Sequence, residues 1–182
     1  DIETIKMFLR LDCPSGGCDP WDRYANIMVR DKTTNEWFEI GRHITPYGVD
    51  NSALSRGLEF DVTDFKNLLE GNVELRIFVE TWVSSGWIVS LEFDFTPGTP
   101  DYKYYKVSRI IQYNGNSLGG VPYGGLNGNT EIDLEKFDLI KSLQIGSNIE
   151  SAHLRTIITG WDMPHQQTCL LYTSPSPRDS MT

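Results

Sequence analysis

Short runs rich in Val, Ile, Phe, Tyr and Trp recur along this chain, and Gly, Pro, Asn and Ser separate them. This pattern is typical of antiparallel strands joined by tight turns. Residues 31–35 and 84–86 each have the composition of a hairpin turn. The sequence therefore predicts an all-β fold of antiparallel strands, either a sandwich or a jelly roll. Its clearest strand-like runs are residues 5–11, 27–30, 36–40, 74–82 and 87–95.

One segment has the pattern of a helix instead. Thr63 has the side chain of an N-cap, Asp64 adds negative charge to the first turn, and Gly71 is a suitable stop. Apolar residues such as Phe65 lie between them at helical spacing. We expect a short helix here, starting at Thr63.

The strand pattern breaks around residues 97–100, Pro-Gly-Thr-Pro, which indicates a domain boundary. We expect an N-terminal jelly roll over residues 1–97 and the truncated start of a second jelly roll over 101–167, which has too few strand-like runs to cover its own faces. Residues 168–182 lack periodicity and are rich in Ser and Pro. We expect a non-native tail there, and a genuine disordered tail is the alternative.

Composition excludes two classes of partner. The chain carries 16 Lys and Arg against 25 Asp and Glu, a net charge of −9, so its field repels nucleic acid. It has no apolar run near the roughly 20 residues of a membrane span. The chain opens directly into a strand-like run, so we interpret its N-terminus as cut and draw nothing from the missing signal peptide.

The spacing of Cys13 and Cys18, with proline and two glycines between them, favours a disulfide that closes a tight loop. Free thiols and a metal site are the alternatives, but a metal needs three or four ligands and nothing nearby supplies the rest. His43, His153 and His165 are scattered, so no histidine pair is available for copper, and we expect no metal. A disulfide would indicate an oxidising compartment.

Strand alternation selects two carboxylates, Asp22 and Glu80. If Ala25, Ile27 and Val29 face the core, then Asp22 lies on the opposite face, and Arg23 should point away from it. In the same way Glu80 lies on the non-core face of its own strand, and each acid has a tryptophan nearby in the sequence.

A carboxylate beside indole rings can have its pKa raised by desolvation, and a second acid nearby raises one pKa further. Such a pair can hold one acid protonated and one ionised at the same pH. The residues thus suggest a sugar-processing hydrolase, whereas solvated surface acids are the alternative reading for either residue alone.

Six sequence blocks resemble the bacterial peptide:N-glycanase F family in order and spacing. The resemblance implies two side-by-side eight-stranded jelly rolls that hydrolyse the amide joining N-acetylglucosamine to asparagine, leaving aspartate and a glycosylamine. The blocks are CDPWDRYANIMV, EWFEIGRHITPYG, RGLEFDVTDFKNLLEGNVELRIFVETW, FDFTPGTPDYKY, QYNGNSLGGVPYG and LRTIITGW.

By that resemblance, Asp22 matches the essential acid and Glu80 a second active-site carboxylate. The residues that match substrate-binding or substrate-shaping positions are Trp21, Arg23, Tyr47, Trp82 and Trp161. The family is further implied to need no cofactor and to act on N-linked glycoproteins. We expect a secreted or periplasmic monomer.

The chain also departs from the family. Gly48 stands where the family has a tryptophan, and Asp162-Met163 replaces a glycine and a histidine. The family's other key glutamate lies in a second-domain segment that this chain does not reach, so we expect this fragment to be inactive. A non-catalytic glycan-binding β-sandwich is the alternative function, and a structural adhesion module is a third.

Overall fold

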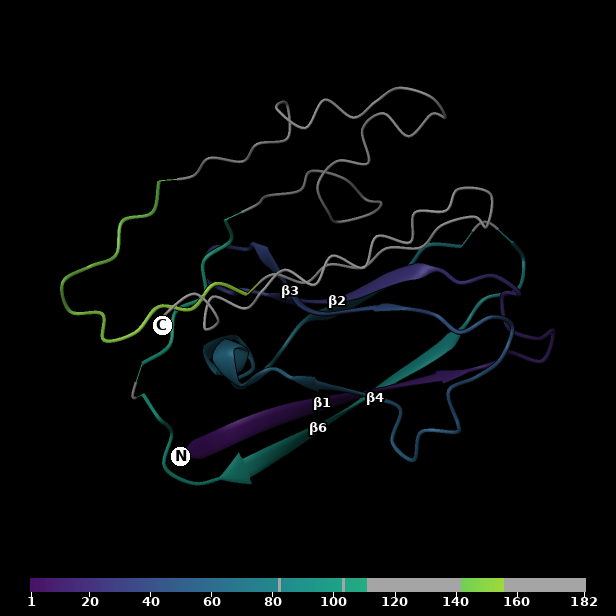
Figure 1. Ribbon diagram of the computed structural model, residues 1–182, viewed down its shortest axis with the longest axis horizontal. Coiled ribbons are helices and arrows are strands. Elements are labelled where there is room, and N and C mark those ends of the chain that lie inside the picture. The colour runs from purple at the N-terminus through teal and green to yellow at the C-terminus, as the bar shows by residue number, and fades with distance from the viewer. Residues whose placement is uncertain (82, 103, 111–141, 156–182) are drawn as a thin grey trace, which may run out of the picture.

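The computed structural model describes residues 1–81, 83–102, 104–110 and 142–155. Its strands form two antiparallel three-stranded sheets stacked as a sandwich (Figure 1). The strand order is β4-β1-β6 in one sheet and β3-β2-β5 in the other. The strands are β1 (Ile2–Asp12), β2 (Tyr24–Arg30), β3 (Trp37–Ile44), β4 (Leu58–Asp61), β5 (Leu75–Val79) and β6 (Ile88–Pro97). The predicted all-β antiparallel class is confirmed.

The core lies between the two sheets and follows the alternation of the strands. Every second residue of β1 from Ile5 to Leu11 is buried, and Ala25, Ile27 and Val29 of β2 are fully enclosed opposite them. This confirms the predicted core face of β2. Burial of each large aliphatic side chain contributes about 1.5–3 kcal/mol, so the alternation fixes which face of each sheet turns inward.

The helix between β4 and β5 is a 3-10 helix, η1 (Thr63–Leu68), with Val62 at its N-cap. The prediction of Thr63 as N-cap is therefore wrong. The Thr63 amide instead donates to Oδ1 of Asp61 at 2.9 Å, and the Thr63 hydroxyl accepts from the Ile5 amide at 3.0 Å. The hydroxyl thus joins η1 to β1, while Phe65 is buried in the core.

One predicted hairpin turn is confirmed and the other is wrong. Residues 31–35 connect the paired strands β2 and β3, with the Asp31 amide donating to the Glu36 carbonyl at 2.8 Å. Residues 84–86 connect β5 to β6, which lie in different sheets, because β6 pairs along its length with β1. The segment is a crossing between sheets, and β4 is a strand that the sequence did not indicate.

The predicted second jelly roll, residues 101–167, lies mostly outside the described residues, as does the tail. Its described stretches, 104–110 and 142–155, contain no regular strand. Arg109 nevertheless contacts the sandwich: it donates to the Trp37 carbonyl at 2.9 Å and pairs with Glu36 at 2.8 Å. Across the described residues no helix is long and apolar enough to cross a membrane.

Candidate active site

Three chain segments meet at one end of the β3-β2-β5 sheet. Tyr24, the first residue of β2, pairs with Ile44, the last of β3, and Ala25 pairs with Val79, the last of β5. The residues just before β2, just after β3 and just after β5 therefore share one rim. This rim carries Asp22 and Glu80.

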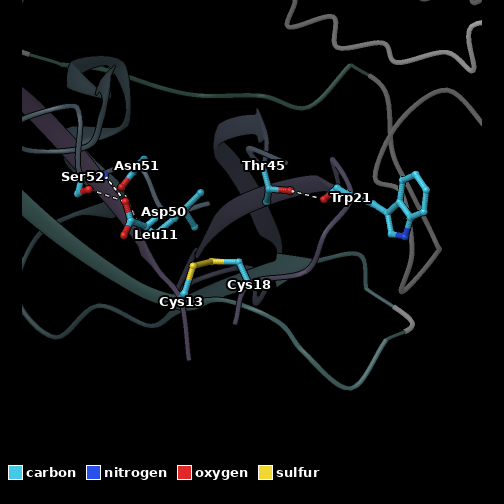
Figure 2. Close-up of a disulfide and its surroundings, with 8 residues drawn as sticks. All are labelled: Leu11, Cys13, Cys18, Trp21, Thr45, Asp50, Asn51 and Ser52. Carbon is cyan, nitrogen blue, oxygen red and sulfur yellow. Dashed lines mark hydrogen bonds between the residues drawn. A yellow bond between two sulfur atoms is a disulfide. The ribbon is translucent and has the colours of Figure 1, made fainter. Parts of the chain in front are cut away.

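Asp22 is half-buried, and two exposed aromatic residues are close to it in the chain or in the fold. Trp21 is 55% exposed and Tyr47, in the loop after β3, is 63% exposed. Figure 2 shows the Trp21 indole projecting away from the backbone and the disulfide. The Tyr47 hydroxyl hydrogen-bonds the Asp22 carboxylate, and this bond, together with the carboxylate's charge, raises the pKa of Tyr47. The rim thus presents a carboxylate bonded to an exposed phenol and directly preceded in the chain by an exposed indole, and such flat rings suit the C–H faces of a sugar.

Glu80 extends the β2–β5 pairing, because its amide donates to the Tyr24 carbonyl at 2.9 Å. Partial burial raises the pKa of its carboxyl above the usual value, while the nearby charge of Arg23 opposes that rise. Glu80 therefore keeps its proton to higher pH than an ordinary glutamate, which is the property that a general acid needs.

Arg23 directly follows Asp22 in the chain, and its charge acts on the Glu80 carboxyl, but its guanidinium is buried. The side chain is 4% exposed and forms a bidentate pair with Asp19, with Nε to Oδ2 at 2.7 Å and Nη2 to Oδ1 at 3.0 Å. Its backbone exchanges two hydrogen bonds with Thr45, at 2.7 and 2.8 Å. The pairing with Asp19 was not foreseen from the sequence. The sequence feature that could have indicated this pair is the spacing of Asp19 and Arg23, which are four residues apart with a proline between them.

The predicted Cys13–Cys18 disulfide is present, with the two Cα atoms 4.5 Å apart (Figure 2). Cys18 is buried and forms an isolated bridge with Gly86, in the connection between β5 and β6. The cross-linked loop is therefore joined to the segment that follows Glu80.

Tyr24 and Asn26 lie on the non-core face, as alternation predicts, yet both are buried there. The Asn26 amide donates to the Tyr24 hydroxyl at 3.0 Å and to Oε2 of Glu39 at 3.2 Å. Phe78 lies beside them, its ring centroid 6.4 Å from that of Tyr24. The outer face below the rim is therefore a packed polar and aromatic layer.

Two predicted site residues, Trp82 and Trp161, lie outside the described residues. Within the described ranges, no group of three or more His, Cys, Asp or Glu side chains is arranged to hold a metal ion. The chemistry at the described rim is thus that of carboxylates, a phenol and an indole.

Comparison with known proteins relates this sandwich to one group of amidases. Residues 24–95 match the family described as "Peptide-N-glycosidase F, N terminal". Over 160 residues the chain is 53% identical to peptide-N(4)-(N-acetyl-beta-D-glucosaminyl)asparagine amidase F of Elizabethkingia miricola, and the match covers 88% of this chain. The resemblance to peptide-N-glycosidase F is confirmed.

Two solved structures of such amidases are also similar to this chain. A crystal structure of a peptide-N(4)-(N-acetyl-beta-D-glucosaminyl)asparagine amidase has a TM-score of 0.63 and 58% identity over 69% of this chain. PNGase F, the glycosylasparaginase from Flavobacterium meningosepticum, has a TM-score of 0.63 and 56% identity over 71% of this chain. These matches cover 40% and 42% of the two solved chains, and the curated match covers 43% of the Elizabethkingia amidase. The chain thus spans less than half the length of each relative.

Proposed function

We propose that the full-length protein is an amidohydrolase that cleaves the amide between N-acetylglucosamine and the asparagine of N-linked glycoproteins, converting that asparagine to aspartate. The observation that carries the proposal is the 53% identity over 160 residues with an asparagine amidase. The rim geometry supports it, since the half-buried Asp22 carboxylate hydrogen-bonds the exposed Tyr47 and directly follows the exposed Trp21 in the chain.

Asp22 and Glu80 are the proposed catalytic residues. Hydrolysis adds water to the amide carbonyl carbon, breaks the carbon–nitrogen bond and delivers a proton to the departing glycosylamine. Positioned carboxylates can carry these proton transfers without a cofactor, each contributing about 10²–10⁴-fold. Asp22 would contact the sugar at the bond to be cut, and Glu80, whose pKa is raised by burial, would hold a proton nearby.

Apart from Arg23, whose guanidinium is buried against Asp19, the remaining predicted site residues would bind the glycan. Trp21 and Tyr47 would stack on its sugar rings, with Trp82 and Trp161 shaping the same cleft, and Arg23 would act next to Asp22. Gly48, with φ of 62°, follows Tyr47 and donates its amide to the Asp19 carbonyl at 3.0 Å. It offers no side chain to the platform, so we expect the sugar surface to be smaller here than in relatives with tryptophan.

The proposal extends to the whole architecture. Residues 1–97 would form an eight-stranded jelly roll and residues 101–167 the start of a second one, which supplies a further glutamate beyond this chain. This chain alone would then be inactive or nearly so. The disulfide fits a secreted or periplasmic protein, because such bonds persist in oxidising compartments. The protein would act as a monomer.

Glycopeptide hydrolysis in oxygen-18-labelled water, followed by mass spectrometry, tests the proposal. The full-length protein should release the whole glycan and leave a labelled aspartate, and Asp22→Asn should abolish this while the melting temperature is retained. Glycan binding that survives Asp22→Asn without cleavage by the full-length protein would favour a non-catalytic binding module. A product that keeps one sugar on an unlabelled asparagine would contradict amide cleavage.

A further inference from the structure

Asp19 is the most enclosed charged residue at the rim. It is 0% exposed, and its carboxylate is hydrogen-bonded by Trp21, Arg23 and Thr81, which lie in the segments that carry the site. Besides the bidentate pair with Arg23, Oδ2 accepts from the Thr81 hydroxyl at 2.6 Å and Oδ1 accepts from the Trp21 amide at 3.0 Å. Both oxygens are therefore saturated with donors.

The carboxylate bonds join two of the three rim segments, and the backbone of Asp19 reaches the third. Trp21 and Arg23 flank Asp22 before β2, and Thr81 directly follows Glu80 after β5. The backbone of Asp19 extends the connection, because its carbonyl accepts from Gly48, after β3, and its amide donates to the Gly86 carbonyl at 3.3 Å. Asp19 also directly follows Cys18 of the disulfide.

The charge balance at this position requires an ionised aspartate. Burial alone would raise the pKa of Asp19, but hydrogen bonds from Arg23, Thr81 and Trp21 outweigh it and lower that pKa. Hydrogen bonds to a charged partner with fixed bidentate geometry are stronger and more directional than neutral ones. The carboxylate can thus hold its three partners in one arrangement.

We propose that Asp19 is a positioning residue that holds Asp22 and Glu80 at their mutual spacing on the rim. Being fully enclosed, it cannot touch a substrate, so it acts through Arg23 on the Asp22 segment and through Thr81 on the Glu80 segment. The inference rests on the proposed amidase function. Misplacement of a reacting group by about 1 Å can cost about 10²-fold in rate, so this link should appear in kcat.

Thr81 offers the sharpest test, because its side chain is exposed and valine has nearly its shape. Thr81→Val removes the 2.6 Å bond to Asp19, whereas Thr81→Ser keeps the hydroxyl. In the full-length protein we expect Thr81→Val to lower kcat about 10- to 100-fold with little change in KM. Thr81→Ser should stay within about threefold of wild type, and the melting temperatures of all three proteins should agree closely.

Glu74→Gln is the matched control. Glu74 pairs with Arg30 at 2.8 Å, and this pair links β2 and β5 at the end of the sheet opposite the Asp19–Thr81 bond. The control substitution should leave kcat unchanged. Asp19→Asn should lower kcat at least as much as Thr81→Val, and if it does not fold, the threonine pair decides alone.

Wild-type kcat in Thr81→Val, or an equal loss in Thr81→Val, Thr81→Ser and Glu74→Gln, would overturn the inference while leaving the amidase function intact. An inactive wild-type protein would overturn the proposed function and this inference with it.

Discussion

At the scale of single residues, two buried ionisable groups take opposite charge states, because hydrogen bonds offset the effect of burial at Asp19 but not at His43. Asp19 is enclosed with a donor for each oxygen, and its charged form is favoured. His43 of β3 is 5% exposed beside Phe60, and neither ring nitrogen has a hydrogen-bond partner among the residues that the structure describes. Burial lowers the pKa of His43 to about 4, so it is neutral in the fold at ordinary pH.

His43 should make the fold sensitive to acid. Below pH 6.5 the unfolded chain takes up a proton at this histidine, while the folded chain does not until about pH 4. Its contribution to stability is therefore present above pH 6.5 and lost between pH 6.5 and 4, amounting to roughly 3 kcal/mol. The free energy of unfolding of wild type should fall more steeply over this range than that of His43→Leu. Parallel curves from urea titrations would contradict the prediction.

At the scale of elements, the loop before β2 is held by a covalent bond and by the bridge to Gly86. The disulfide closes a loop between residues five apart in sequence, and Cys18 then leads directly into Asp19. Since the same short stretch supplies Trp21 and Asp22, the cross-link restricts the approach of the chain to the site.

Removing this disulfide should destabilise the domain modestly. A loop this short contributes about 2 kcal/mol on the loop-entropy model. The paired substitution of Cys13 and Cys18 by serine should lower the melting temperature, and a reducing agent should lower that of wild type to the same value. The serine variant should not respond to the reducing agent. A wild-type melting temperature that reduction leaves unchanged would show that the bond contributes nothing.

Prediction from sequence worked best where one local rule decides the structure. The two-residue period of β2 fixed Ala25, Ile27 and Val29 in the core, because a one-residue shift would expose all three. It failed where a residue has a distant partner. Thr63 bonds Ile5, which is 58 residues away, and Asp19 bonds Thr81, which is 62 residues away, so no local pattern could show either contact.

At the scale of the whole molecule, chain segments that follow the sandwich in sequence contact its surface. Lys66 lies over the Tyr105 ring at 3.9 Å and Arg155 over the Phe65 ring at 5.5 Å, so segments beyond residue 100 pack onto η1. The described segments 104–110 and 142–155, which contain no strand and lie beyond the boundary predicted at residues 97–100, thus still contact the first unit. Composition marked where the strand pattern stops, but it could not show which surfaces remain in contact.

The account depends on Asp22 and Glu80 acting together from adjacent segments of one rim. A double-mutant cycle on kcat/KM in the full-length protein, with Asp22→Asn, Glu80→Gln and both combined, tests this most directly. When two groups serve the same bond-breaking step, removing one already removes most of the rate enhancement that the other provides. The loss of kcat/KM in the double variant should therefore be far smaller than the product of the two single losses. If the two losses simply multiply, the carboxylates act independently and the shared site is wrong.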